Sequence, residues 1–256
     1  MTALKDRVYI VTGGTRGLGK AIAQSLIARG ARVGLVGRDA ALLRQTAAEL
    51  GPDDALPVAL DITHCAHLPQ GFARIKAHFG RLDGLVNNAG LARPGHILDM
   101  EEAEVDLQLN TNIKGTVFCC QAAVPLLEGG DNPRILNISS ASAWHQDEMA
   151  HLSIYAASKA AVERFSRDLR GELQGRGIGV TVLRPGAAIT DFASAWEMER
   201  FRAALQAWQQ LGTHMDTGME PRHVGEAAAW CLACPPGVAV DLLEIRPNRP
   251  APKVTF

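Results

Sequence analysis

A phenol and an amine stand one helical turn apart in the second half of the chain. Tyr155 and Lys159 belong to "SIYAASKAAVERFSRDL" at residues 153–169, whose apolar residues recur at helical spacing. Side chains four residues apart lie on one face of a helix, so these two are predicted neighbours. A surface pair at a helix end has the same pattern. The alternative is a phenol that exchanges its proton in a reaction, because a nearby ammonium stabilises the phenolate.

A glycine-rich segment supplies a second candidate site. "TGGTRGLG" at residues 12–19 stands between a strand-like run and a helix-like run. Gly13, Gly17 and Gly19 would let backbone amides approach a phosphate at a helix N-terminus, where the helix dipole favours anions. After the first strand of an alternating chain, such a turn predicts a dinucleotide site.

Short apolar runs alternate with longer stretches of helical period, which predicts how these groups are positioned. The alternation indicates βαβ units, and hence an α/β fold with a doubly wound parallel sheet of about seven strands and helices on both faces. No linker or repeat divides residues 1–256, so we expect a single domain. Strands are expected at 7–12, 31–37, 56–61, 82–88, 134–139, 178–185 and 240–245, and helices at 17–28, 40–50, 72–79, 100–127, 153–169, 192–211 and 221–233.

The composition argues against several classes of partner. The chain has 47% hydrophobic and 21% charged residues and a formal net charge of −1, which does not indicate nucleic acid or an anionic membrane. No apolar run approaches the ~20 residues that span a bilayer, so no membrane partner is expected. The five cysteines, an odd number, favour reduced thiols and a cytoplasmic location.

Two short motifs contain residue types that bind metals. They are "HCAH" at residues 64–67 and "CLAC" at residues 231–234. No second CxxC is present to complete a tetrahedral site, and both segments fit the ends of helices. We therefore predict no metal.

Four motifs together resemble one protein family. "TGGTRGLG", "NNAG" at 87–90, "YAASK" at 155–159 and "RPGAAIT" at 184–190 occur in the order typical of the short-chain dehydrogenase/reductase family, in its short single-domain branch. The resemblance implies a Rossmann-like fold and an oxidoreductase that transfers hydride between a nicotinamide cofactor and a carbonyl or secondary alcohol. It also implies a homodimer or homotetramer.

The resemblance assigns cofactor contacts to the glycine turn and to the ends of several strands. Asp61 is also a candidate helix N-cap, and Pro185 and Gly186 also fit a simple turn. The implied cofactor-binding residues are Gly13, Thr15, Arg16, Gly17, Leu18, Gly19, Arg38, Asp61, Ile62, Asn88, Ala89, Gly90, Tyr155, Lys159, Pro185, Gly186, Ala188 and Thr190.

The end of the second strand favours NADP(H) over NAD(H). Sites that prefer NAD hold a carboxylate there, against the ribose 2′-hydroxyl. This chain has Gly37 followed by Arg38, and a guanidinium binds a 2′-phosphate well. Arg16 could reach the same phosphate. Asp39 lies close by, and we interpret it as a helix N-cap.

A serine is expected to complete the reaction centre. The resemblance assigns the substrate-binding hydroxyl to Ser140, which would donate a hydrogen bond to the carbonyl oxygen. Ser142 is the alternative, because it stands thirteen residues before Tyr155, the commoner spacing in the family. Tyr155 is the implied general acid and base, and Lys159 would lower its pKa and bind the ribose.

The fourth expected catalytic residue is an asparagine within residues 100–127. The resemblance assigns it to Asn112, which would hold a water that relays protons. Asn110 is the competitor, although it lacks the following glycine spacing. Asparagine is disfavoured inside an apolar helix, which favours a functional role.

Apolar residues on two segments suggest an apolar or aromatic substrate, although ordinary packing would also account for them. A lid is expected at about residues 190–215. The alternative to an enzyme is a non-catalytic NADP(H)-sensing or scaffold protein on the same fold. A nucleotide-sugar epimerase is disfavoured, because those chains are longer. The candidate substrate-pocket residues are Ser142, Trp144, Met149, Phe192 and Trp196.

Overall fold

One seven-stranded sheet organises the computed structural model, which describes residues 4–145, 150–210 and 218–249. The strand order is β3-β2-β1-β4-β5-β6-β7, and every neighbouring pair is parallel. The chain starts at the centre and winds outward in both directions, so the predicted doubly wound sheet is confirmed. The strands are β1 (Val8–Thr12), β2 (Arg32–Gly37), β3 (Ala55–Ala59), β4 (Gly84–Asn87), β5 (Arg134–Ile138), β6 (Gly179–Pro185) and β7 (Leu242–Ile245).

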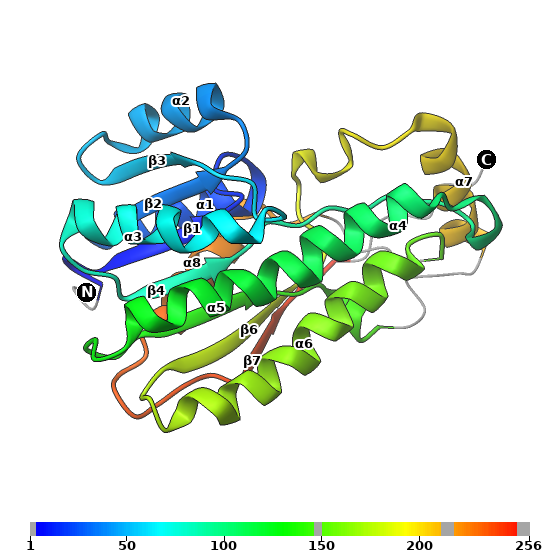
Figure 1. Cartoon of the computed structure of the whole chain (residues 1–256). Coiled ribbons are helices and arrows are strands. Elements are labelled where there is room, and N and C mark those ends of the chain that lie inside the picture. Colours follow the sequence, from blue (N-terminus) through cyan, green and yellow to red (C-terminus); the bar gives the residue numbers. More distant parts are fainter. Residues whose placement is uncertain (1–3, 146–149, 211–217, 250–256) are drawn as a thin grey trace.

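Helices cover both faces of this sheet, as the alternation predicted. In Figure 1, α3, α5 and α6 lie in front of the sheet, and α1 and α8 lie behind it. The helices are α1 (Gly17–Ile27), α2 (Ala40–Leu50), α3 (Leu68–Phe79), α4 (Glu102–Leu109), α5 (Thr116–Leu127), α6 (Ser153–Gln174), α7 (Met198–Gln210) and α8 (Pro221–Leu232).

Each face of the sheet has its own hydrophobic core. Along β1, Val8 and Ile10 belong to the core beneath α3, α5 and α6. Tyr9 and Val11 belong to the core beneath α1, α2 and α8. The alternation follows from the two-residue period of a strand. A sheet buried on both faces explains why its strands are continuous apolar runs.

The long helix predicted at 100–127 is two helices joined by a π-helical turn. The turn spans Asn110–Gly115 and buries Asn112 and Gly115. A side chain at Gly115 would meet Ile62, since an added Cβ would lie 2.7 Å from its Cδ1. Turns of this kind occur often at functional sites. The wider turn therefore brings Asn112 inward from a helix that otherwise runs along the sheet.

The helix predicted at 192–211 begins later than expected. Residues Asp191–Ala193 form a short 3-10 turn instead, and α7 starts at Met198. The Thr190 hydroxyl accepts a hydrogen bond from the Phe192 amide at 3.3 Å. Such a side-chain cap favours a turn over a continuous helix.

We expect truncation of a core side chain in α3 to destabilise the protein strongly. Phe72 is fully buried in the core beneath α3, α5 and α6. Phe72→Ala should lower the free energy of unfolding by about 3 to 5 kcal/mol. Leu98→Ala is the control, because Leu98 is 85% exposed and its loss should change stability by less than about 0.5 kcal/mol. Equal effects in chemical denaturation would contradict this core.

Candidate active site

A cavity of about 700 Å³ opens at the carboxyl ends of the strands. Ligands of doubly wound sheets bind at this edge, where the winding direction reverses. Nearly all residues predicted from the sequence line this cavity. Gly19, Asn112 and Trp144 do not line it, and Met149 lies outside the described residues. The predicted residues that line it are Gly13, Thr15, Arg16, Gly17, Leu18, Arg38, Asp61, Ile62, Asn88, Ala89, Gly90, Ser140, Ser142, Tyr155, Lys159, Pro185, Gly186, Ala188, Thr190, Phe192 and Trp196.

The glycine turn keeps its backbone open toward the cavity. Gly13 and Gly17 have φ angles of 65° and 51°, which favour glycine. Gly19 has a packing role, since an added Cβ would lie 2.1 Å from the Gly13 carbonyl oxygen. Arg16, the N-cap residue of α1, makes no side-chain cap. No capping side chain therefore takes up the first amides of α1, and they can bind an anion.

The "NNAG" segment fixes the glycine turn from the side of β4. The Asn88 amide nitrogen donates to the carbonyl oxygens of Thr12 at 3.0 Å and Gly13 at 3.2 Å. In return, the Thr12 hydroxyl accepts from the backbone amides of Asn88 and Ala89. Asn88 thus stabilises the turn through its own side chain.

The end of the cavity where the adenosine was predicted contains the guanidinium groups of Arg16 and Arg38 and two carboxylates. Asp39 accepts from the amides of Ala41 and Leu42, so its prediction as a helix cap is confirmed. Asp61 accepts from the amide and hydroxyl of Thr63. Burial opposes ionisation of Asp61, but the hydrogen bonds from Thr63 and the charge of Arg38 outweigh it and lower its pKa. Arg38 lines the cavity at the point where a 2′-phosphate was predicted.

The loop after β6 is supported from two neighbouring segments. The Gly186 amide donates to the Ile245 carbonyl in β7 at 2.8 Å. Ala188 forms an isolated parallel bridge with Met219. Thr190 lies against the glycine turn, since an added Cβ at Gly17 would lie 3.4 Å from its Cβ. These contacts hold "RPGAAIT" along the cavity wall.

Tyr155 and Lys159 are buried together at the start of α6. Burial raises the pKa of Tyr155 to about 12, while a hydrogen bond with Ser140 opposes the rise. Burial also lowers the pKa of Lys159 to about 8. The Lys159 amine donates to the Ile138 carbonyl at 2.8 Å and lies 6.0 Å from the centre of the Tyr155 ring. The fold therefore places the phenol, the amine and the serine hydroxyl in one desolvated group.

Ser140 stands between Ser142 and the phenol. The Ser142 hydroxyl donates to the Ser140 hydroxyl at 2.9 Å, and Ser140 forms the hydrogen bond with Tyr155. Ser140 is the second residue after β5 and caps a short 3-10 turn. Ser142 is thus one hydrogen bond further from the phenol.

Asn112 joins the "NNAG" segment to α6. Its side chain accepts from the Leu91 amide and donates to the Leu91 carbonyl, both at 2.9 Å. It also donates to the Ser158 hydroxyl at 2.9 Å. Gly90 fits between these groups, since an added Cβ would lie 3.2 Å from the Lys159 amine and 3.3 Å from the Asn112 oxygen. The fully buried Asn112 therefore positions the loop beside Lys159.

A network of ion pairs and hydrogen bonds that includes Ser139 connects α6 to the sheet. Glu163 accepts from the Ser139 hydroxyl at 2.6 Å and from the Arg184 guanidinium at 2.8 Å. Arg184 also donates to Glu244 in β7 at 2.8 Å. The hydrogen bond with Glu163 is the main reason that the pKa of Arg184 is raised. Sequence reasoning missed this network, because its members come from β6, β7, α6 and the residue that follows β5.

A chain of aromatic rings leads from Tyr155 into α7. Ring centroids lie 5.4 Å apart for Tyr155 and Phe192, 5.8 Å for Phe192 and Trp196, 5.5 Å for Trp196 and Phe201, and 6.4 Å for Phe201 and Trp208. The side chains of Phe192, Trp196, Phe201 and Trp208 also line the cavity. This end is therefore apolar and aromatic, as the sequence suggested.

Trp144 lies outside this aromatic wall. It is 68% exposed, and the Arg184 guanidinium carbon lies 5.7 Å from the centre of its ring. The sequence predicted Trp144 in the substrate pocket because it is an apolar residue in the segment between the serine and Tyr155. The short turn at Ala141–Ala143 directs it outward instead.

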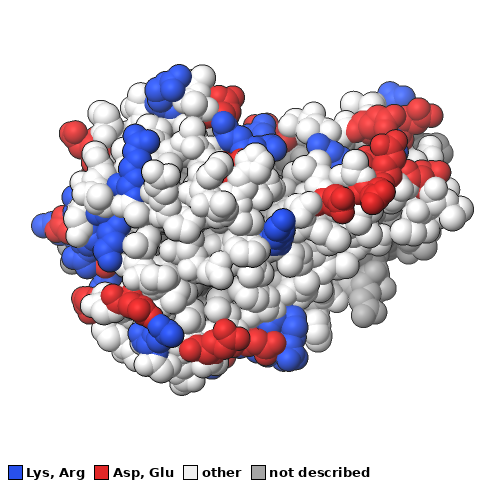
Figure 2. All heavy atoms as spheres, in the orientation of Figure 1, with Lys and Arg blue, Asp and Glu red and all other residues white. Residues whose placement is uncertain are grey.

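Residues of α7 are fastened to the rest of the molecule by polar contacts. The end that carries α4 and α7 is rich in acidic side chains (Figure 2). There Arg200 donates to both carboxylate oxygens of Glu104, at 2.7 and 2.6 Å, and to the Asp99 carbonyl. The Trp208 indole donates to the Ala150 carbonyl at 2.6 Å. These contacts hold the aromatic wall over the cavity.

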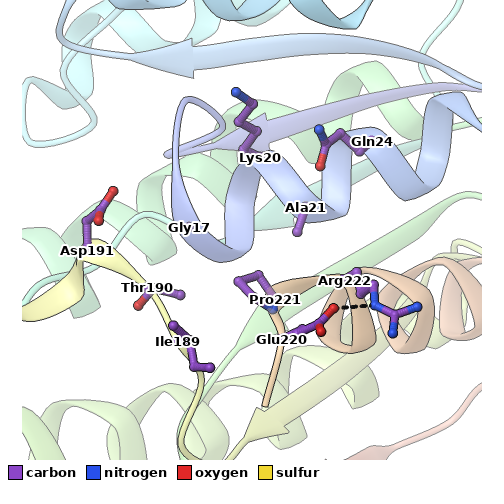
Figure 3. Close-up of a pocket in the computed structure, with 10 residues that line it drawn as sticks. All are labelled: Gly17, Lys20, Ala21, Gln24, Ile189, Thr190, Asp191, Glu220, Pro221 and Arg222. Atoms are coloured by element: carbon purple, nitrogen blue, oxygen red, sulfur yellow. Dashed lines mark hydrogen bonds and ion pairs between the residues drawn. The ribbon is translucent and has the colours of Figure 1, made fainter. Parts of the chain in front are cut away.

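A second pocket of about 360 Å³ adjoins the glycine turn (Figure 3). Gly17, Thr190 and Asp191 line both this pocket and the larger cavity. At the start of α8, Glu220 and Arg222 form an ion pair of 2.5 Å along its wall. The smaller pocket is therefore a side extension of the larger one.

Neither metal-like motif gathers ligands. Within the part of the chain that the structure describes, no three His, Cys, Asp or Glu side chains form a group that could hold a metal ion. "HCAH" contributes the short turn Cys65–His67, and Cys231 is buried at the end of α8. Among the same residues, no helix has both the length and the apolar character needed to cross a membrane.

Comparisons with known proteins define the class of this chain. A family model described as short chain dehydrogenase matches residues 7–200. An uncharacterised oxidoreductase of Staphylococcus aureus (strain USA300) is 32% identical over 247 residues, covering 96% of this chain and 100% of that protein. The chain therefore belongs to the short-chain dehydrogenase family of oxidoreductases, and the resemblance seen in its motifs is confirmed.

Solved structures agree with this fold. A 3-ketoacyl-(acyl-carrier-protein) reductase from Brucella melitensis, complexed with NADH, is 28% identical with a TM-score of 0.83, covering 96% of this chain and 99% of that one. A short chain dehydrogenase from Burkholderia cenocepacia, in complex with NADP, is 29% identical with a TM-score of 0.82, covering 95% and 97%. Since one holds NADH and the other NADP, these likenesses do not select one cofactor.

We expect the buried amine of Lys159 to give the cofactor-free protein a distinct pH dependence. Its pKa falls from 10.5 in the unfolded chain to about 8, so between these values the unfolded chain binds more protons. Lys159 should therefore contribute a rise of the free energy of unfolding with pH across this window, by up to about 1 kcal/mol per pH unit. The buried thiols of Cys119, Cys120 and Cys231 contribute with the opposite sign, because burial raises their pKa. Lys159→Met should remove the Lys159 contribution, which is measured as the difference between the two proteins in urea denaturation at about pH 8 to 10.

The matched control is Lys114→Met, because Lys114 is exposed on the π-helical turn. This variant should keep the pH dependence of the wild type. If the free energies of unfolding of the wild type and Lys159→Met change with pH in parallel, Lys159 is not held in a desolvated site.

Proposed function

We propose that this protein is an NADP(H)-dependent carbonyl reductase or secondary-alcohol dehydrogenase that acts as a single domain. The observation that carries the proposal is the desolvated group of Tyr155, Ser140 and Lys159 at the edge of the cavity lined by the glycine turn. A phenol and a hydroxyl in this arrangement can hold and protonate a carbonyl oxygen.

The cavity has donors that fit a dinucleotide. The uncapped first turn of α1 and the open glycine turn suit a diphosphate. Arg16 and Arg38 line the adenosine end, where two guanidinium groups suit a 2′-phosphate. Lys159 and the backbone near Gly90 lie where the ribose and nicotinamide would bind. When bound, the reduced nicotinamide supplies the hydride that reaches the carbonyl carbon.

Proton movements fall to the side chains of this chain. Ser140 would donate a hydrogen bond to the substrate oxygen, and Tyr155 would pass its phenolic proton to that oxygen. Because burial holds the pKa of Tyr155 at about 12, the phenol is protonated and ready to donate near neutral pH. The Lys159 ammonium would then stabilise the phenolate until a solvent proton restores it. The oxidation of an alcohol would follow the reverse path.

The aromatic chain supports an apolar or aromatic body for the substrate, with the lid at about residues 190–215, of which 211–215 lie outside the described residues. A homodimer or homotetramer and a cytoplasmic location remain part of this proposal. A non-catalytic NADP(H) sensor is the competing function. The four predicted catalytic side chains are all present and the reactive hydroxyls are hydrogen-bonded to one another, which favours the enzyme.

Replacing the two serines separately tests which hydroxyl holds the substrate. Ser140→Ala should lower kcat for reduction of a hydrophobic ketone by about a hundredfold or more, since it removes the donor beside the phenol. Ser142→Ala removes a donor one step further away and should cost less than about tenfold. Fluorescence titration should show that both variants still bind NADPH. The reverse order of effects would assign the role to Ser142.

Cofactor choice is tested by steady-state kinetics with both nucleotides. We expect kcat/KM with NADPH to exceed that with NADH by at least about tenfold, and Arg38→Ala to remove most of this difference. Arg222→Ala is the control, because Arg222 is paired with Glu220 in the side pocket. Equal or better use of NADH by the wild type would contradict the NADP(H) proposal.

A further inference from the structure

Arg93 brings a positive charge to the cavity that the proposed chemistry does not use. It lines the cavity, is half-buried and follows Gly90 by three residues. Its Nη1 donates to the Ala92 carbonyl at 3.1 Å. Within residues 4–145, 150–210 and 218–249, no carboxylate lies within ion-pair distance of Arg93. A guanidinium has five N–H donors, and only one described acceptor is present for this partly desolvated group, so most of its hydrogen-bonding capacity is unused.

Two other guanidiniums near this cavity have their partners. Arg184 donates to Glu163 and Glu244, and Arg200 donates to both oxygens of Glu104. Burial opposes ionisation of Glu104, and the hydrogen bond from Arg200, with a smaller effect from Arg93, lowers its pKa. Glu104 is therefore near Arg93 but engaged by Arg200. The charge of Arg93 remains available to a ligand.

The position of Arg93 is at the reacting end of the cavity. Its neighbour Ala92 belongs to one buried cluster with Tyr155, Leu152 and Trp208. The Arg93 backbone amide donates to the fully buried Gln108 side chain at 3.1 Å, which fixes this part of the loop. Arg93 therefore lines the cavity directly after a residue that packs with Tyr155 and with Trp208 of the aromatic wall. Arg16 and Arg38, in contrast, lie at the adenosine end.

Cavity-lining carboxylates elsewhere do not compete for this charge. Asp39 caps α2 and Asp61 holds Thr63, both at the adenosine end. Asp191 is exposed and shared with the side pocket beside the glycine turn. Arg246, from the segment after β7, lines the cavity as well. The described residues that line the cavity thus include four guanidinium groups, those of Arg16, Arg38, Arg93 and Arg246.

We infer that Arg93 binds a carboxylate of the substrate, so that the protein reduces oxo acids and oxidises the corresponding hydroxy acids. A guanidinium can hold a carboxylate through two parallel hydrogen bonds, which orients as well as attracts it. The aromatic wall then receives an apolar body attached to the same molecule. The carboxylate is unchanged in the reaction, since hydride adds to the carbonyl carbon and the Tyr155 proton adds to its oxygen. This inference rests on the proposed function.

A binding experiment tests Arg93 without requiring turnover. 3-Phenylpropionate and its neutral analogue 3-phenylpropionamide are titrated by calorimetry into the wild type, Arg93→Gln and Arg93→Lys, each with NADPH present. The wild type should bind the carboxylate at least about tenfold more tightly, as expected for a charge-assisted hydrogen bond. Arg93→Gln should lose this preference, and Arg93→Lys should keep part of it. Equal affinities in the wild type, no binding of either compound, or a preference that survives Arg93→Gln would overturn the inference.

Turnover separates this inference from the proposed function. The wild type should reduce 4-phenyl-2-oxobutanoate with a lower KM than its methyl ester, and Arg93→Gln should raise KM for the acid alone. The protein could fail to reduce either compound and still bind 3-phenylpropionate more tightly than its amide in an Arg93-dependent way. That result would contradict the proposed reaction and support the carboxylate site at Arg93. Unchanged NADPH affinity and melting temperature in Arg93→Gln confirm that the variant is folded.

Discussion

Removal of two ionisable groups from water at one place is the constraint on which the proposed chemistry depends. Tyr155 and Lys159 lie one turn apart on α6, and burial shifts both toward their neutral forms. Among the residues that the structure describes, no counter-ion offsets this burial, and the Lys159 amine donates to the uncharged Ile138 carbonyl. A desolvated pair of this kind is sensitive to any charge that enters the cavity. The positive ring of an oxidised nicotinamide would favour the phenolate in this environment.

The surrounding structure keeps this pair in register with the sheet. Asn112 fixes the loop after β4 against α6, and Asn88 fixes the same loop against the glycine turn. Glu163 ties α6 to Ser139, directly before Ser140. Asn112 is fully buried and Asn88 and Glu163 are partly buried, so loss of one partner would leave a poorly hydrated polar group unsatisfied. The site thus depends on a connected set of hydrogen bonds as much as on the reacting residues.

Much of the fold could be predicted because its signals are local. The alternation of apolar strands and amphipathic helices gave the strand number and the parallel sheet, and the four motifs placed most of the cavity wall. The π-helical turn at Asn110–Gly115 was missed, because its sequence differs little from that of an α-helix. Pairs such as Arg200 with Glu104 were missed for another reason: their members lie 96 residues apart, so only the folded chain brings them together.

Side-chain direction was the least predictable property of the site. Trp144 and Phe192 were both expected in the substrate pocket on the basis of their apolar character. The turn after Ser140 exposes Trp144, whereas the Thr190 cap brings Phe192 onto the Tyr155 ring. Arg93 is the opposite case, because it lines the cavity although nothing in the sequence after "NNAG" indicated this. Such directions depend on local turns that periodicity does not report.

The most direct test of the central claim is the phenolate absorbance of the protein as NADP+ is added. The chain has two tyrosines, and burial raises the pKa of Tyr9, so only Tyr155 should ionise at about pH 9. Addition of NADP+ at this pH should produce about one phenolate per chain in the wild type and none in Tyr155→Phe. If NADP+ binds but no phenolate forms, the phenol is not coupled to the cofactor and the proposed proton transfer is wrong.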